Sequence, residues 1–247
     1  MKKSPGASSS AKAGGGGNQG APTYWRVSRG LAASLVFIVP LLVLYEAGVM
    51  MAHATPNAME HVIKSPFFVF GSQGVMVFNL AAIVALSVAL ASLVRGQALR
   101  WSVFPVMLAE SLLYASLLHP LVRLALYQEL WAPIAPRVFD GFWFKAATAA
   151  GAGVYEEIAF RGLLLAGMVW VGERVLKAPR ALNVVASVLL SSAVFSAWHF
   201  VEVGGAAWEP FLYRLVAGAA LGAIYLARGL GVAAYTHALF NVIVFCV

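Results

Sequence analysis

Long apolar segments constrain this chain more than any other feature of its sequence. Seven of them follow one another, at about 31–51, 75–94, 103–126, 144–171, 182–200, 211–227 and 230–247. A membrane-spanning helix needs about 20 mainly apolar residues, and lipid offers no hydrogen-bonding partner to an unpaired backbone group. The sequence therefore predicts an all-α fold, a polytopic transmembrane helix bundle of about seven spans.

The composition excludes several other classes of protein. Hydrophobic residues make up 61% of the chain and charged residues 11%, whereas a soluble domain is about one quarter charged. The single cysteine, Cys246, excludes an internal disulfide and a cysteine-based metal cluster. The net charge of +7 would suit a nucleic-acid partner. We expect none, because most of the basic residues lie in the N-terminal tail and in alternate loops.

The distribution of Lys and Arg predicts how the chain sits in the membrane. Cytoplasmic segments of membrane proteins are enriched in these residues, so the richer set of loops is assigned to the inner side and the N-terminus to the cytoplasm. The residues on the predicted inner side are Lys2, Lys3, Lys12, Arg26, Arg29, Arg95, Arg100, Arg174, Lys177, Arg180 and Arg228. The outer segments hold at most Lys64, Arg137 and Lys145.

The chain divides into three parts. Residues 1–24 are rich in Gly, Ser, Ala and Lys, cannot bury a core, and are predicted to form a disordered cytoplasmic tail. Residues 25–141 are predicted to form N-terminal membrane helices, with a loop at about 52–74 lying on the membrane surface. Residues 142–247 are predicted to form a second membrane domain, which carries the polar clusters described next.

The segment Tyr155-Glu156-Glu157-Ile158-Ala159-Phe160-Arg161 puts three charges into one predicted span. Each charge at the centre of a membrane helix costs roughly 2.5–3.5 kcal/mol. Glu157 and Arg161 stand four residues apart on one helix face and can pair, whereas Glu156 is rotated about 100° from Glu157. We interpret Glu157 as structural and Glu156 as free for chemistry. The alternative, a buried charge network that fixes helix register, explains Glu157 and Arg161 better than it explains Glu156.

Two further polar clusters lie in later spans. His199 ends the segment Phe195-Ser196-Ala197-Trp198-His199, and His237 and Asn241 are four apart on one helix face. A carboxylate can take a proton from water, and an imidazole can orient that water or relay the proton. A second imidazole and an amide can donate to an oxyanion. These parts suffice to hydrolyse an amide without a covalent intermediate. Taken singly, the same residues suit an interfacial histidine and an interhelical hydrogen bond.

The order Glu-Glu-x-x-x-Arg, Phe-x-x-x-His, His-x-x-x-Asn resembles the CAAX-protease and bacteriocin-processing (CPBP, or Abi) family of intramembrane proteases, over about 142–245. The resemblance implies an intramembrane endopeptidase of the bacterial cytoplasmic membrane, with its catalytic domain at 142–247. Its substrate would be a membrane-associated or lipid-modified protein or peptide with a membrane-proximal cleavage site. The resemblance makes Glu156 the base that activates water and His199 its assistant. It makes His237 and Asn241 the groups that stabilise the tetrahedral intermediate, with Glu157 and Arg161 in support.

Three alternatives stay open. The family has been described both as glutamate-type and as metalloproteases; a zinc ion would take Glu156, His199 and His237 as ligands, which removes the free base. We favour a site without a cofactor, because an Asn amide is an unusual zinc ligand. A noncatalytic membrane scaffold or immunity-type binder could hold a transmembrane partner in the same pocket. Intramembrane Glu and His also build proton relays, which would suit a small proton-coupled transporter.

Overall fold

The computed structural model describes residues 23–52, 57–95, 101–126, 141–203 and 207–246. Every element within these ranges is helical and none is a strand, which confirms the predicted all-α class. The first part of the described chain forms α1 (Tyr24–Ser28), α2 (Leu31–Ala52), α3 (Ala58–Lys64), the 3-10 helix η1 (Ser65–Gln73), α4 (Gly74–Arg95) and α5 (Val103–Ala125). Residues 1–22, which belong to the predicted tail, lie outside these ranges.

The second part of the described chain is a composite helix followed by three long ones. The composite helix consists of α6 (Phe142–Gly151), two π-helical segments η2 (Ala152–Glu156) and η3 (Ile158–Leu165), and α7 (Ala166–Arg174). It is followed by α8 (Arg180–Val203), α9 (Trp208–Arg228) and α10 (Leu230–Cys246). All seven predicted apolar segments are therefore helical where the structure describes them.

Five stretches of helix among the described residues are long and apolar enough to cross a membrane, and Leu230–Val244 is a shorter apolar helix. The stretches are Leu31–Met51, Ala58–Arg95, Val103–Ala125, Arg180–Phe200 and Trp208–Arg228. With the composite helix and α10 the bundle agrees with the prediction of about seven spans, and the protein is an integral membrane protein.

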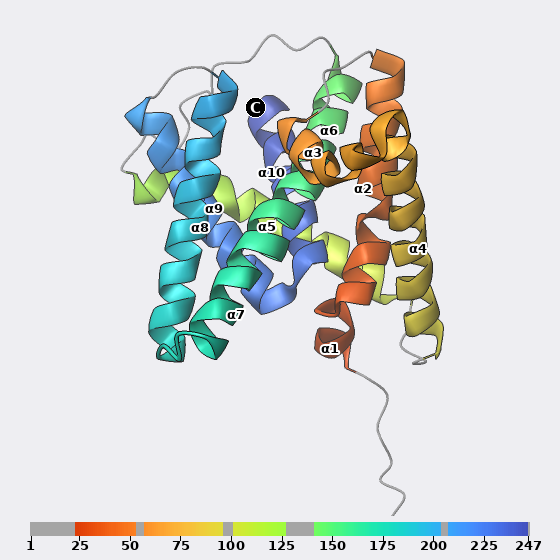
Figure 1. The fold of residues 1–247 in the computed structure, drawn as a ribbon. Helices are drawn as coiled ribbons and strands as arrows, with labels where there is room; N and C mark the ends of the chain where they lie inside the picture. Colours follow the sequence, from red (N-terminus) through yellow and green to blue (C-terminus); the bar gives the residue numbers. More distant parts are fainter. Residues whose placement is uncertain (1–22, 53–56, 96–100, 127–140, 204–206, 247) are drawn as a thin grey trace, which may run out of the picture.

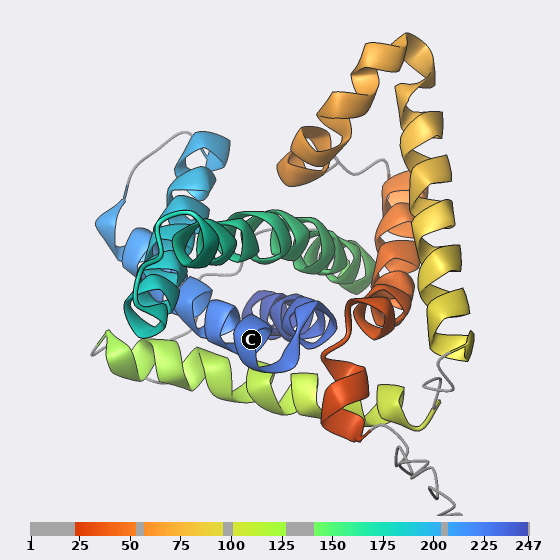
Figure 2. The same ribbon diagram turned by 60° about the horizontal axis from the view of Figure 1, so that its bottom comes forward.

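Helix α10 lies at the centre of the bundle. It packs against α5, α6, η2, α2 and α9, and in Figures 1 and 2 the other helices surround it, with α8 and α9 on one side and α2 and α4 on the other. Small residues permit this close packing. A Cβ atom on Gly153 of η2 would lie 2.6 Å from the carbonyl oxygen of Ala234, so only glycine fits at this crossing. The segment that carries Glu156 is thereby held directly against α10.

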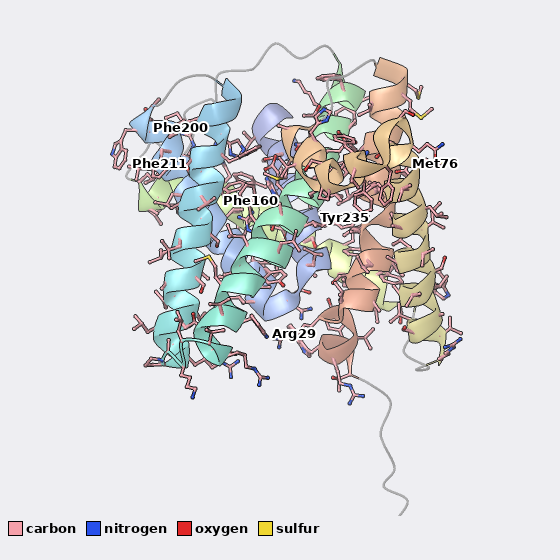
Figure 3. All side chains as sticks on the ribbon, viewed as in Figure 1. Arg29, Met76, Phe160, Phe200, Phe211 and Tyr235 are labelled. Atoms are coloured by element: carbon pink, nitrogen blue, oxygen red, sulfur yellow. The ribbon has the colours of Figure 1, made fainter. Side chains whose placement is uncertain are left out.

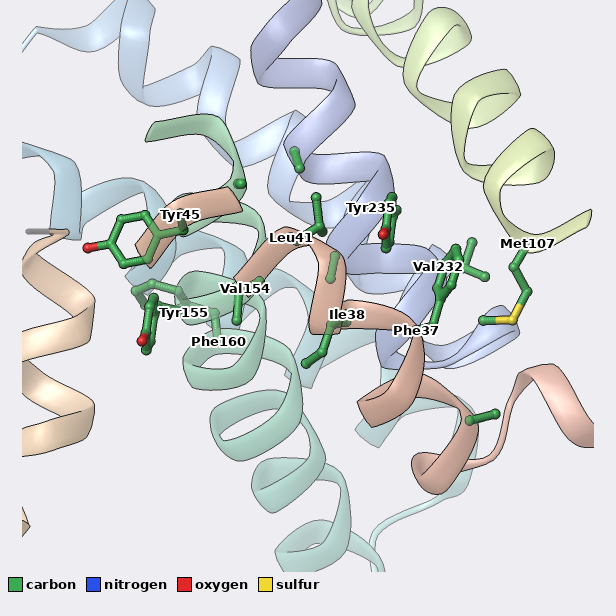
Figure 4. Packing of buried hydrophobic residues seen from close by; sticks show 14 of the residues in the cluster. Phe37, Ile38, Leu41, Tyr45, Met107, Val154, Tyr155, Phe160, Val232 and Tyr235 are labelled. Atoms are coloured by element: carbon green, nitrogen blue, oxygen red, sulfur yellow. The ribbon is translucent and has the colours of Figure 1, made fainter. Parts of the chain in front are cut away.

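Aromatic and aliphatic side chains fill the space between α2, η2 and α10. Phe37 of α2 stacks on Tyr235 of α10 with 4.2 Å between ring centroids, and Tyr45 of α2 meets Tyr155 of η2 edge to face at 5.4 Å. Figure 4 shows these side chains, with Val154 between the Tyr45–Tyr155 pair and the Phe37–Tyr235 pair. Because lipid surrounds the bundle, such packing and polar contacts, rather than exclusion of water, hold the helices together.

The segment predicted as a surface loop at about 52–74 is largely helical, which corrects that prediction. Asn57 caps α3 by accepting a hydrogen bond from the Met59 backbone N–H, and η1 follows without a break. In Figure 2, α3 and η1 extend from the bundle and return through α4. Phe68, Val69 and Phe70 of η1 are exposed, as expected of residues that contact lipid or its interface.

Arg29, Arg95, Arg174, Arg180 and Arg228 lie at one end of the bundle. The end of α1, the ends of α4, α7 and α9 and the start of α8 all lie at the lower end in Figure 1, where Figure 3 labels Arg29. Arg29 donates to the carbonyl of Leu226 at 3.1 Å and so ties the α1–α2 junction to α9. That this end faces the cytoplasm stays a prediction.

A buried ion pair closes the same end. Arg228 donates to both carboxylate oxygens of Glu110, at 2.5 and 2.7 Å, and its guanidinium lies 3.9 Å from the centroid of the Trp25 ring. The Tyr24 hydroxyl also donates to Glu110, at 2.7 Å. Glu110 therefore joins α1, α5 and α9.

We expect Glu110→Ala to lower the free energy of unfolding by about 1–3 kcal/mol, because it leaves the buried Arg228 without its charged acceptor. Thermal unfolding in detergent measures the change. Glu173→Ala is the matched control, since Glu173 belongs to an exposed pair with Arg180 that should contribute at most about 1 kcal/mol. Equal melting temperatures for the two variants would contradict the structural role of Glu110.

Candidate active site

Three of the four predicted catalytic residues come together in the structure: two histidines face one carboxylate oxygen of Glu156. Glu156 lies at the end of η2, His199 near the end of α8 and His237 in the middle of α10. The Nε2 atom of His199 lies 3.8 Å from Glu156 Oε2, and the Nε2 atom of His237 lies 3.9 Å from the same oxygen. Glu156 and His237 are buried, and His199 is partly buried. The packing of η2 against α10, and of α8 against η3 and α9, creates this arrangement.

The helix that carries the two glutamates is π-helical at this point. Its i→i+5 bonding puts more residues into each turn than an α-helix has, so neighbouring side chains are separated by less than about 100°. In ideal π-helical geometry the offset between Glu156 and Glu157 is smaller than the roughly 100° of an α-helix. Both carboxylates reach the same imidazole: Glu157 Oε1 lies 2.7 Å from His237 Nδ1, and Glu156 Oε2 faces Nε2. π-Helical segments are rare and occur often at functional sites.

Glu157 and Arg161 form a buried pair behind the site. Glu157 is fully buried, and its Oε1 atom accepts a hydrogen bond from Arg161 at 2.7 Å in addition to the contact with His237. Arg161 also donates to the carbonyl of Gly218 on α9 at 3.1 Å. This placement suits the supporting role expected for both residues: Arg161 fixes Glu157, and Glu157 fixes the His237 ring.

The backbone sets the tautomer of His199. Its Nδ1 atom lies 2.9 Å from the carbonyl oxygen of Phe195, one turn earlier in α8. A carbonyl oxygen can only accept, so Nδ1 carries the proton, and in the neutral ring Nε2 has a free lone pair. That lone pair faces Glu156. His199 is thus prepared to accept a proton on the side of the ring where the carboxylate lies.

Phe195 forms a common wall for the site. Its ring meets His199 and His237 edge to face, with centroid separations of 4.9 and 5.8 Å, and the Arg161 guanidinium lies 4.5 Å from its centroid. The sequence motif contains Phe195, but the spacing alone gives it no role. In the structure it excludes solvent from one side of the histidines and holds the arginine in a cation–π contact.

The two oxygens of Glu156 have different surroundings. Oε1 accepts a hydrogen bond from the Asn57 side chain at 3.2 Å, and Oε2 is buried with no hydrogen-bond partner among the groups of the described chain. An unsatisfied buried carboxylate oxygen is costly and calls for a functional explanation. Asn57 was not expected from the sequence, although Asn57 and Glu60 have the spacing of a helix N-cap and its third residue, a signal for the start of α3.

Asn241 is placed differently from the other predicted residues. It lies on α10 one turn beyond His237, is partly buried, and forms no hydrogen bond within the part of the chain that the structure describes. Its predicted contact with a reacting group is left as a prediction.

The three candidate zinc ligands do not form a metal site as they stand. Among the described residues, no group of three or more His, Cys, Asp or Glu side chains is placed to hold an ion. Two ligands of a tetrahedral zinc with bonds of about 2.0–2.1 Å lie roughly 3.3 Å apart. Both imidazole nitrogens lie farther than that from Glu156 Oε2, at 3.8 and 3.9 Å.

Comparison with known proteins supports the resemblance of the motifs. Residues 136–243, slightly less than half of the 247-residue chain, match the sequence model of a family described as type II CAAX prenyl endopeptidase Rce1-like. The matched stretch contains all three motifs. Searches of curated proteins and of solved structures found no match. The predicted domain boundary at residue 142 stays a prediction. The chain therefore carries an Rce1-like domain at residues 136–243, which supports the resemblance to the CPBP family of membrane proteases.

Proposed function

We propose that this protein is an intramembrane endopeptidase in which Glu156 activates a water molecule. One observation carries the proposal: Glu156 Oε2 is buried, has no hydrogen-bond partner among the described groups, and faces two imidazole nitrogens at 3.8 and 3.9 Å. These separations are too long for direct hydrogen bonds, and a water oxygen about 2.8 Å from each group would join them. A base and its water can thus be held together inside the bilayer.

The reaction begins when Glu156 takes a proton from the water. The water oxygen then bonds to the carbonyl carbon of the substrate, and the carbonyl electron pair moves onto its oxygen. The neutral His199, with its Nε2 lone pair facing Glu156, orients the water. When the tetrahedral intermediate collapses, the C–N bond breaks and the proton held by Glu156 passes to the leaving nitrogen. The new carboxyl group gives up its remaining proton to His199 and then to solvent.

His237 and Asn241 stabilise the oxyanion of the intermediate. Glu157 accepts a hydrogen bond from Nδ1–H of His237. The Nε2 atom of His237 can therefore donate a hydrogen bond only when the ring carries both protons. The buried Glu157 carboxylate supplies the countercharge for that imidazolium. The Asn241 amide adds a neutral donor one helical turn away. A donor of this kind typically accelerates acyl transfer by about 10²–10³-fold.

The proposed substrates are peptide bonds next to a membrane anchor. The description of the matched family points to prenylated C-termini; leader peptides and C-terminal sorting tails are the other candidates. The test uses purified protein in liposomes and an internally quenched peptide with a prenylated cysteine four residues from its C-terminus. Mass spectrometry of membrane-protein termini, with and without an active copy, extends the search to unmodified substrates. Cleavage by wild type, with its loss in Glu156→Gln, is the expected result.

A noncatalytic binder makes a different prediction in the same experiment. If the pocket only holds a transmembrane partner, wild type will cleave nothing in either assay. Glu156→Gln and His199→Ala will then retain function. If the protein is an enzyme, both variants will lose cleavage while they still bind the peptide, which fluorescence anisotropy measures. Binding without cleavage by wild type contradicts the proposal.

We expect His199→Ala to lower kcat by roughly 10²-fold, because the water loses its second hydrogen-bonding partner. Added imidazole should restore part of the activity, since the removed ring leaves a space of its own shape beside Phe195. His61→Ala is the matched control, because His61 is exposed on α3 and should leave the rate unchanged. A rate for His199→Ala within about twofold of wild type would remove His199 from the mechanism.

A further inference from the structure

The residue that holds Glu156 comes from the part of the chain that the family match does not cover. Asn57, at the start of α3, donates from Nδ2 to Glu156 Oε1 across 99 residues of sequence, at 3.2 Å. Of the hydrogen bonds among described groups, this one fixes the carboxylate of the proposed base. Helix α3 packs directly against η2, so the contact is part of an interface between two elements.

Asn57 is itself fixed at two other points. Its Oδ1 atom accepts from the Met59 backbone N–H at 2.8 Å, and its own backbone N–H donates to the Tyr45 hydroxyl at 2.8 Å. Because Oδ1 faces a backbone donor, the amide can turn only its NH₂ group toward Glu156. The orientation of the Asn57 side chain is therefore determined by the cap of α3.

A buried polar network anchors Asn57 to α2 and to η2. The Tyr45 hydroxyl donates to Glu60, and Lys64 pairs with Glu60 one turn along α3. Lys64 lies 3.8 Å from Glu46, which accepts from the Tyr155 hydroxyl at 3.1 Å. Figure 4 shows Tyr45 and Tyr155 side by side, which places this network directly before Glu156 in the chain.

We propose that Asn57 is a positioning residue for the base. It holds Oε1 of Glu156, and so turns Oε2 toward the imidazole nitrogens of His199 and His237. The inference rests on the proposed function of Glu156. A shift of about 1 Å in a reacting group can cost 10²-fold in rate, so the loss of this single bond should affect kcat more than substrate binding.

The test compares Asn57→Ser with Asn57→Asp. Both residues are good N-caps, so α3 begins normally in each. Serine is too short to reach Glu156, and we expect kcat to fall about 10-fold or more while KM stays within about twofold. Aspartate places a second carboxylate against Glu156. Two carboxylates in contact are not easily ionised at the same time, so Glu156 would more often carry a proton and could not act as the base. We therefore expect activity to fall further than in Asn57→Ser at neutral pH, and to decrease most steeply as the pH is lowered.

The other charged groups near the site stay the same in both variants. Glu156 is faced by His199 from α8 and by His237 from α10, and Glu157 and Arg161 lie behind it on its own helix. Asn57 is faced by Tyr45 from α2 and, through it, by Glu60 and Lys64 of α3. The difference between the two pH profiles therefore reports the change at residue 57.

Ser65→Ala is the matched control. Ser65 lies at the other end of α3, is exposed, and donates to the Val62 carbonyl at 2.8 Å without reaching the site. We expect its kcat and its pH profile to equal those of wild type. Matching profiles for wild type, Asn57→Ser and Asn57→Asp would overturn the proposal, provided that wild type cleaves the prenylated peptide and Glu156→Gln does not.

A second readout does not depend on cleavage. Infrared difference spectra, with Glu156→Gln as the reference, isolate the carboxylate stretching bands of Glu156. We expect these bands to move in Asn57→Ser, because Oε1 loses its donor, and to stay unchanged in Ser65→Ala. Identical bands in wild type and Asn57→Ser overturn the inference, even where kcat falls, since α3 would then act through packing alone. If wild type cleaves nothing, the proposed function is wrong, but the spectra still show whether Asn57 bonds to Glu156.

Discussion

Glu156→Gln is expected to reduce cleavage at least about 10³-fold, to the background rate. The substitution keeps the length and nearly the shape of the side chain, and the amide oxygen can still accept from Asn57. What it removes is the ability to take a proton from water. Loss of a general base typically costs 10²–10⁴-fold. The neighbouring carboxylate, Glu157, has its Oε1 atom bonded to Arg161 and His237 and does not face the Nε2 atoms of the two histidines.

The measurement is single-turnover cleavage of the prenylated peptide in liposomes, with peptide binding followed separately. Binding should persist in Glu156→Gln, since the charge of the base is not part of the substrate contact. Glu173→Gln serves as the control for loss of a carboxylate, because Glu173 is exposed and lies outside every motif. Residual activity within tenfold of wild type, or full activity in Glu156→Ala, would assign the base to another group.

The sequence predicts the helical elements of this protein well for a simple physical reason. Each apolar segment is long enough to span a bilayer, and within lipid a helix satisfies its own backbone hydrogen bonds. The same reasoning applies to the site: in a compact bundle, polar side chains from separate spans gain by meeting one another. Glu156, His199 and His237 accordingly come together in the structure.

The parts that sequence reasoning missed depend on contacts with no local signal. The π-helical turn changes the angle between Glu156 and Glu157, and a period of 3.6 residues cannot reveal it. The bond from Asn57 to Glu156 requires α3 to fold back onto η2. The spacing of Asn57 and Glu60 could have indicated where α3 begins, but not which side chain it would reach. Glu110 likewise finds Arg228 across 118 residues.

Arg161→Met is expected to destabilise the protein by about 3–5 kcal/mol, because it leaves the buried Glu157 carboxylate without its cation. Arg161 is almost fully buried, pairs with Glu157 at 2.7 Å and bonds the carbonyl of Gly218. Methionine fills a similar volume, so loss of packing contributes little. Unfolding by denaturing detergent in mixed micelles measures the change. The matched control is Arg180→Met, which breaks an exposed pair with Glu173 and should cost at most about 1 kcal/mol.

The double variant Glu157→Gln/Arg161→Met separates stability from catalysis. Because both charges are removed together, we expect it to recover much of the stability that Arg161→Met loses. We do not expect it to recover activity, since His237 has lost the carboxylate that orients its ring and balances its charge. Recovery of both would show that the pair serves the fold alone. Recovery of stability without activity places Glu157 in the mechanism, through the imidazole that it holds.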